Sequence, residues 1–120
     1  MYLVEDKSYS WVRTFRELKG GDIVQNKGAR ANLVTQGVFI VDHLPTGRFI
    51  IGTSRTVSAE VDKNIDALIR GTHPNRMLQK QYNHGPDLRL IEIPARSAKE
   101  AKQIEAKIRK SNTTDYCLLN

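Results

Sequence analysis

Cysteine is almost absent from this chain, since Cys117 is the single example among 120 residues. One cysteine excludes an intrachain disulfide and a metal site built from cysteine ligands, and it favours a reducing compartment. Long apolar runs are lacking too, because no stretch approaches the ~20 residues that a membrane-spanning helix needs. The first residues, Met-Tyr-Leu-Val-Glu-Asp-Lys, show no basic leader followed by an apolar segment. We therefore expect a cytoplasmic protein with no membrane contact.

Acidic residues are outnumbered by basic ones. The chain has 19 Lys and Arg against 13 Asp and Glu, which gives a net charge of +6 and an isoelectric point near 9.7. This excess favours contact with polyanions, although an ordinary basic protein has the same composition. At 13.6 kDa the chain is long enough for one hydrophobic core and too short for two ordinary domains.

Histidines are few, and none is paired at helical spacing. His43, His73 and His84 all fall in turns or at helix edges, without an i, i+4 partner that would suggest a metal site. We interpret all three as solvated turn residues rather than as ligands or catalytic bases.

Apolar periodicity is clearest after residue 36. Two short strands, 38–41 and 49–51, are separated by a turn with Pro45 and Gly47, which predicts a β-hairpin. A helix follows from about residue 57 and stops at Gly71, where a left-handed glycine ends helices well. A second helix begins near Pro74 and ends before residue 83.

The last third of the chain predicts one more strand and one more helix. Residues 88–93 form the strand, and Pro94 prevents its continuation. Ser97 and Glu100 have the spacing of a capping box, which opens a helix through about residue 110. The predicted order is β-β-α-α-β-α over residues 37–120.

Residues 1–36 differ from the rest and are predicted to be an N-terminal extension. Trp11, Val12, Phe15 and Leu18 give an approximate helical stripe, residues 23–25 suggest a strand, and residues 26–32 suggest a basic loop. A solvated connector explains this loop better than a phosphate contact does.

Three segments in this order resemble the GIY-YIG nuclease family. Residues 37–40 (Gly-Val-Phe-Ile) are similar to its first motif and residues 48–54 (Arg-Phe-Ile-Ile-Gly-Thr-Ser) to its second. Residues 68–79 are similar to its run of Leu, Gly, His, Asn and Leu-Gln. The resemblance extends from residue 37 to about 116. It implies an α/β (α+β) fold with a three-stranded, mainly antiparallel sheet flanked by helices.

The resemblance also implies which positions once carried chemistry. The family cleaves DNA with one divalent ion, using a tyrosine to activate water, an arginine to stabilise phosphate charge and a glutamate to bind metal. The matching positions that lack the family's groups are Phe39, Ile50, Glu60 and Asn64. Phe39 and Ile50 cannot accept a proton, and Glu60 places negative charge where positive charge is needed.

Glu105 alone matches the family's metal-binding glutamate. Its spacing from Ala101 and Ile108 predicts that it borders the core and faces the sheet. It binds Mg²⁺ or Mn²⁺ if the protein is active, or it pairs with Lys102, Arg109 or a sheet residue. We favour a structural pair, because one carboxylate is a poor divalent site, and we expect no cofactor in a degenerate relative. Asp42 and Glu92 are candidate second carboxylates.

Basic side chains follow the hairpin and the first two helices, and they are candidates for nucleic-acid contact. They are Arg48, Arg55, Lys63, Arg70, Arg76 and Lys80. Glu60, Asp62 and Asp66 interrupt this series, so an ordinary solvated face is an equally good interpretation. The trio Thr53, Ser54 and Arg55 suits either a phosphate or a helix cap.

Three functions are open at this point. The first and preferred one is a catalytically degenerate GIY-YIG relative that binds nucleic acid, preferentially DNA, or a nucleic-acid-processing partner. The second is a divergent nuclease in which Glu105 binds metal, while Tyr82, Tyr116, Lys63 or a residue of the N-terminal extension replaces the lost groups. The third is a protein-interaction module such as an inhibitor or assembly factor. The resemblance suggests a phage or mobile-element origin, and hence the host cytoplasm, while the oligomeric state is open.

Overall fold

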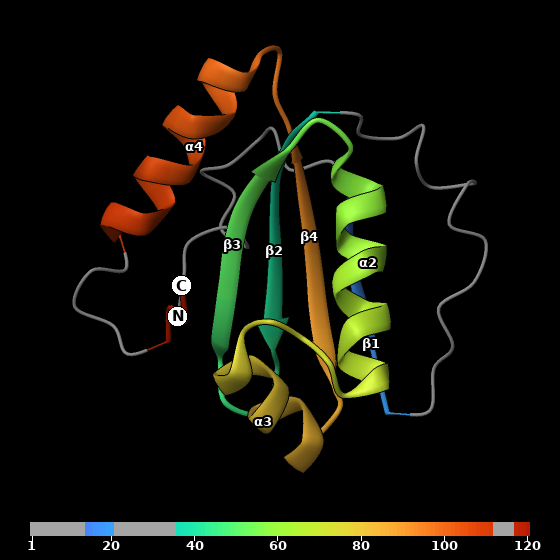
Figure 1. The fold of residues 1–120 in the computed structure, drawn as a ribbon. Coiled ribbons are helices and arrows are strands. Elements are labelled where there is room, and N and C mark those ends of the chain that lie inside the picture. Colours follow the sequence, from blue (N-terminus) through green and yellow to red (C-terminus); the bar gives the residue numbers. More distant parts are fainter. Residues whose placement is uncertain (1–13, 21–35, 112–116) are drawn as a thin grey trace.

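A computed structural model describes residues 14–20, 36–111 and 117–120, and within them it shows one antiparallel sheet with helices on both faces (Figure 1). The sheet order is β1-β4-β2-β3. The strands are β1 (Thr14–Leu18), β2 (Gly37–His43), β3 (Arg48–Ser54) and β4 (Leu88–Pro94). The helices are α2 (Val57–Arg70), α3 (Arg76–His84) and α4 (Ala98–Ser111). Among the described residues, no helix is long and apolar enough to cross a membrane.

Alternation along β2 divides the core into two layers. Val38 and Ile40 belong to the cluster under α4, with Ala101 and Ile108 from that helix. Phe39 and Val41 belong to the other cluster, which α2 and α3 cover. Successive residues of β2 point to opposite faces of the sheet, and helices cover both faces. All seven residues of β2 are therefore buried. The sheet therefore separates an α4 face from an α2–α3 face.

Local signals account for several of the helix ends. Gly71 adopts a left-handed conformation at the end of α2, and its amide caps the carbonyls of the last turn. The Asn75 side chain accepts the amide of Leu78 at the start of α3. Ser97 accepts the amide of Glu100, as the predicted capping box requires. The predicted hairpin, the Ser97 cap and the Gly71 stop are confirmed. α3 begins at Arg76 with Asn75 as its N-cap, so Pro74 precedes the helix instead of lying in its first turn, and α3 continues to His84 rather than ending before residue 83.

Two glycines in the motif-like segments have steric reasons to be there. A Cβ on Gly37 would collide with the backbone oxygen of Ile93 in the neighbouring strand. A Cβ on Gly52 would lie 2.7 Å from Cζ of Phe39, its partner across the β2–β3 ladder. Close packing of strand on strand and of ring on backbone thus requires both glycines.

The predicted helix around Phe15 and Leu18 is wrong, because residues 14–18 form β1. This strand pairs antiparallel with β4, from Thr14 opposite Glu92 to Leu18 opposite Leu88. The free edge of β4 supplies hydrogen bonds that outweigh a weak local helical pattern. The α+β class is confirmed, and β1 adds a fourth strand to the three that were predicted. Trp11, Val12 and residues 23–32 lie outside the described residues, and the domain boundary at residue 36 stays a prediction.

Candidate functional site

Phe39 and Ile50 lie in the core between the sheet and α2. Their side chains are 8% and 5% exposed and pack with Val57, Val61 and Ile65. Each therefore holds α2 against the sheet. Neither position offers a polar atom to a substrate, so both act here as packing residues.

Glu60 and Asn64 lie one turn apart on α2, and Asn64 is held in a hydrogen-bonded position. Its Nδ2 donates to the backbone oxygen of Glu60 at 2.8 Å. Its Oδ1 lies 2.6 Å from Nε2 of His73. Because the amide orientation is fixed by the first contact, Nε2 of His73 carries the proton and donates it to Asn64. Asn64 thus positions a histidine from the loop that follows its helix.

His73 is buried and neutral rather than a solvated turn residue. Its Nδ1 accepts the backbone amide of Asn75 at 2.9 Å, which an imidazolium could not do. Burial lowers the pKa of His73 below its usual value of 6.5. With both ring nitrogens occupied, His73 connects Asn64 in the middle of α2 to Asn75 at the start of α3.

His43 also departs from the prediction of a solvated turn histidine. It is 1% exposed and lies within hydrogen-bond distance of the Thr46 hydroxyl and the Gly85 carbonyl. The Gly85 contact means that the end of α3 packs over the β2–β3 turn, and local sequence gives no sign of this tertiary contact. His84 is exposed, as predicted.

Gln79 ends the run that resembles the family's Leu-Gln, but its burial and its hydrogen bonds were not predicted from the sequence. Its Oε1 accepts the amide of His73 at 3.0 Å, while its Nε2 donates to the Leu68 carbonyl at 3.0 Å and to Asn83 Oδ1 at 2.9 Å. These contacts join the last turn of α2, the connecting loop and α3. The available signal was its position beside Leu78, on the inner side of a helix whose other residues are mostly polar.

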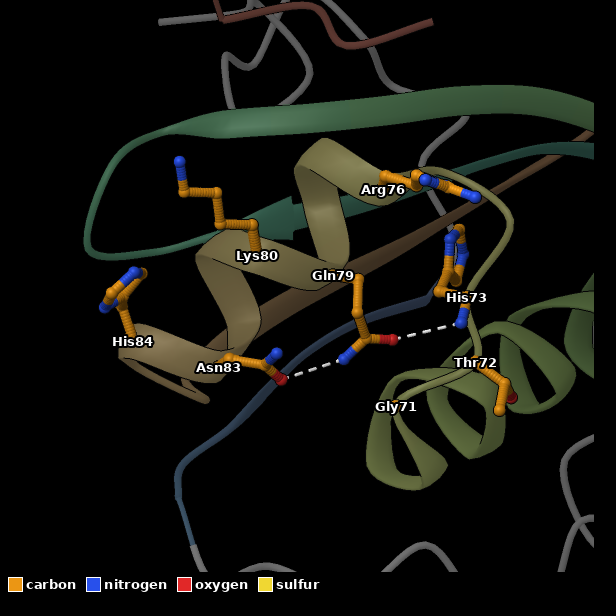
Figure 2. A pocket seen from close by; sticks show the side chains of 8 residues that line it. All are labelled: Gly71, Thr72, His73, Arg76, Gln79, Lys80, Asn83 and His84. Carbon is orange, nitrogen blue, oxygen red and sulfur yellow. Dashed lines mark hydrogen bonds between the residues drawn. The ribbon is translucent and has the colours of Figure 1, made fainter.

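An open groove of about 440 Å³ lies over this network, between the end of α2 and α3 (Figure 2). Its lining residues are Gly71, Thr72, His73, Arg76, Gln79, Lys80, Asn83 and His84. Residues 67–86 contain no Asp or Glu, so α3 and the described residues that line the groove carry no acidic side chain. The groove is therefore polar and positively charged.

The structure gathers part of the predicted basic set around this groove. Arg76 and Lys80 line it. Arg70 lies at the end of α2 that leads to α3, and it pairs with Asp66 at 3.1 Å. Arg48 begins β3 on the face that α3 covers, as its alternation with Phe49 indicates.

The other two predicted basic residues lie elsewhere. Arg55 is exposed at the turn between β3 and α2, at the opposite end of α2 from α3 (Figure 1). Lys63 is exposed near the middle of α2. Beside Arg55, the Ser54 hydroxyl accepts the amide of Thr56 at 2.9 Å, so it serves the turn before the helix. The six basic residues therefore do not form one continuous surface.

Glu105 lies on the α4 side of the sheet and is paired with Arg109. Its Oε2 accepts from Nε at 3.0 Å and from a terminal nitrogen of the guanidinium at 2.9 Å. Arg109 also donates to the backbone oxygens of Ile51 at 3.2 Å and of Asn120 at 2.6 Å. Glu105 thus has one of the structural partners expected from its sequence, and its role as a metal ligand stays a prediction.

Residues 117–120 run parallel to β3 and satisfy its outer edge. The Phe49 amide donates to the Cys117 oxygen at 2.7 Å, and the Leu119 amide donates to the Phe49 oxygen at 2.8 Å. The Asn120 side chain continues this pattern, because it bonds both the amide and the oxygen of Ile51. The pairing of these residues with the edge of β3 was not predicted. It brings the Asn120 oxygen beside Ile51, and Arg109 donates a hydrogen bond to the backbone oxygen of each.

The candidate second carboxylates do not join Glu105. Asp42 points to the α4 face and Glu92 to the α2–α3 face, as their strand positions require. Glu92 is fully buried and accepts the Ser58 hydroxyl at 2.6 Å. Within the described part of the chain, no three His, Cys, Asp or Glu residues come together as a metal-binding group.

Comparison with known proteins gives one structural likeness. No family model and no curated protein sequence matches the chain. A search of solved structures finds the catalytic domain of the homing endonuclease I-TevI, with a TM-score of 0.54 and 17% sequence identity. The match covers 71% of this chain and 98% of that domain. The chain therefore shares the fold of this GIY-YIG nuclease domain over most of its length.

Proposed function

We propose that this protein is a catalytically inactive GIY-YIG-fold protein that binds nucleic acid, preferentially DNA, at the groove between α2 and α3. The observation that carries the proposal is the contrast between Glu105, which a guanidinium already neutralises, and the acid-free groove beside α3. The likeness to a nuclease catalytic domain supports a role in nucleic-acid metabolism.

The lack of cleavage rests on the chemistry of the positions that resemble catalytic ones. Phosphodiester hydrolysis needs a group that activates water and a positive charge near the developing phosphorane. Phe39 and Ile50 provide apolar packing, and Glu60 provides charge of the wrong sign. Both contacts of Arg109 go to Oε2 of Glu105, and its guanidinium offsets the carboxylate charge that would attract a divalent ion. We therefore propose that neither Mg²⁺ nor Mn²⁺ is a cofactor.

Nucleic-acid binding rests on charge and accessibility. Arg76 and Lys80 are exposed, line the groove and pair with no carboxylate in the described part of the chain. Arg48 begins a strand on the same face, and Arg70 lies at the neighbouring helix end. Binding phosphates at such a surface releases counterions, which makes affinity depend steeply on salt.

Plasmid cleavage tests the inactive state. Supercoiled plasmid is incubated with the protein and Mg²⁺ or Mn²⁺, beside the Glu105→Ala variant, and nicked and linear products are quantified. We expect no cleavage above a buffer control by either protein. Cleavage by the parent that disappears in the variant would show a divergent nuclease that uses Glu105.

Binding is tested with fluorescently labelled DNA duplex, single-stranded DNA and RNA, each titrated by fluorescence anisotropy at several salt concentrations. We expect saturable binding that weakens steeply between low and physiological salt, with DNA preferred. An absence of binding to all three at low salt would contradict the proposal. In that case a protein partner, whose affinity depends less on salt, becomes the better explanation of the surface.

A further inference from the structure

Three side chains on α3 form a regular series along the groove. Arg76, Lys80 and His84 are spaced at i, i+4 and i+8, so they follow one side of the helix, and all three are exposed (Figure 2). We call these three residues the α3 stripe. Each step of four residues advances about 6 Å along a helix axis, which is comparable with the separation of consecutive phosphates in one nucleic-acid strand.

The side-chain acceptors of the groove are already used within the protein. Gln79 Oε1 accepts the amide of His73, and Asn83 Oδ1 accepts from Gln79. The groups left for a ligand can all donate: the guanidinium and the ammonium only donate, while the His84 imidazole and the Thr72 hydroxyl can donate or accept. A surface rich in donors, two of them cationic, suits phosphate oxygens, which only accept hydrogen bonds.

The groove is poorly suited to a nucleobase. Sequence-specific recognition of an unpaired base needs hydrogen bonds to its edge and a flat side chain on which it stacks. Among the described residues, no Phe, Tyr or Trp lines the groove, and Tyr82, the aromatic residue of α3, packs against the core cluster under α2 and α3. The residues that line the groove therefore suit the sugar-phosphate backbone of a nucleic acid better than a nucleobase.

We propose that the α3 stripe binds consecutive phosphates of a single nucleic-acid strand, whatever its base sequence. The proposal rests on the proposed function and goes further, because it names the part of the ligand that enters the groove. Gln79 acts as a positioning residue, since its contacts to Leu68 and His73 hold α3 at a fixed place beside the end of α2. The same chemistry serves a single strand and one strand of a duplex.

The test compares salt dependence in two matched double variants. Arg76→Ala with Lys80→Ala removes two charges from the stripe, while Lys99→Ala with Lys102→Ala removes two exposed charges from α4 on the other face. Probes are a labelled mixed-sequence strand, a strand of the same length built from abasic sites, and a duplex. Affinity is measured by anisotropy over a range of salt.

For the stripe variant we expect the slope of log affinity against log salt to fall by about 0.7 per lost contact on single strands and about 0.9 on duplex. The loss of affinity should be equal for the mixed and abasic strands. The α4 variant should keep the slope of the parent. A second stripe variant, Arg76→Gln with Lys80→Gln, retains helix-forming side chains and should give the same change.

The outcomes separate this proposal from the proposed function. If the parent binds but the stripe variants keep its slope, or if the α4 variant loses as much, the phosphate stripe is wrong while nucleic-acid binding stands. If the abasic strand is bound far more weakly than the mixed one, bases rather than phosphates enter the groove. If the parent binds no probe at low salt, both proposals fail.

Discussion

Charged side chains are used differently on the two faces of the sheet. On the α4 face, Glu105 is paired with Arg109, and Arg109 is bonded in turn to the backbone of Ile51 and Asn120. On the α2–α3 face, Arg76 and Lys80 project into an open groove without a carboxylate partner among the described residues. The first group is fixed by internal contacts, whereas the second is available to a ligand.

This difference shows that a residue can match a family motif in sequence and still have its side chain engaged within the protein. Glu105 was predicted from its sequence position to be a metal ligand if the protein is active, while in the structure its carboxylate is paired with Arg109, which bonds the last residues and β3. The groove residues match no catalytic group, yet they have the exposure and charge that binding needs. Mutations on each face should therefore affect different properties.

Replacing Gln79 with alanine should have the largest effect on stability. The substitution leaves the buried His73 amide and the Leu68 carbonyl without their partner, and each such loss costs about 1–3 kcal/mol. We expect the free energy of unfolding to fall by about 2–4 kcal/mol in urea denaturation. Binding should weaken as well, because α3 loses its fixed position.

Gln81→Ala is the matched control for this change. Gln81 is on the same helix, and the hydrogen bond of its side chain goes to the sulfur of Met77 at 3.8 Å. We expect it to change stability by less than about 0.5 kcal/mol. Equal losses in both variants would mean that the buried hydrogen bonds of Gln79 add nothing to stability, and that they do not hold α3 in place.

Arg109→Ala should have a smaller effect, confined to stability. It removes the ion pair with Glu105 and the bonds to Ile51 and Asn120. Because the Arg109 side chain is about a third exposed, solvent weakens these contacts, and we expect a loss of about 1–2 kcal/mol by thermal or urea unfolding. Nucleic-acid affinity at a temperature where the variant is folded should not change.

Lys102→Ala provides the control on the same helix, since the Lys102 side chain is exposed and, within the described part of the chain, has no hydrogen bond or ion pair with Arg109 or Glu105. It should leave both stability and binding close to those of the parent. A marked loss of affinity in Arg109→Ala, with Lys102→Ala unaffected, would place the ligand on the α4 face and contradict the division of roles between the two faces.

Local patterns predicted most of the elements, because strong signals marked them. The Pro45–Gly47 turn, the Gly71 stop and the Ser97–Glu100 box each act within a few residues. Phe15 and Leu18 were assigned to a helix because a five-residue strand shows little periodicity of its own, and its pairing with β4 is a contact across the chain.

The candidate site was less predictable for the same reason. Charge alone identified Arg76 and Lys80, and the apolar stripe of α4 placed Glu105 near its structural partner. The burial of His43 and His73 was missed, since it arises where α3 packs over the hairpin and where α2 meets the following loop. The cover of β3 by residues 117–120 joins segments far apart in sequence, and no local pattern encodes it.

The pH dependence of stability should show the smallest effect, and it concerns His73. Its pKa is lowered by burial in the folded protein and returns to about 6.5 on unfolding. Below 6.5 the unfolded chain therefore binds a proton that the folded one does not, so stability falls as pH decreases toward the folded pKa and then levels off. The slope within that window is at most about 1.4 kcal/mol per pH unit.

The measurement is urea denaturation of the parent, His73→Gln and His84→Gln between pH 5 and 8. His73→Gln should lose part of the decline below pH 6.5, whatever its stability at pH 8, because the titrating ring is gone. His84→Gln should keep the decline, since the replaced histidine is exposed and lines the groove rather than the core. If instead only His84→Gln flattens the plot of stability against pH, the protonation that matters occurs at the groove surface. The hydrogen bonds of His73 to Asn64 and Asn75 would then not make the junction of α2 and α3 sensitive to pH.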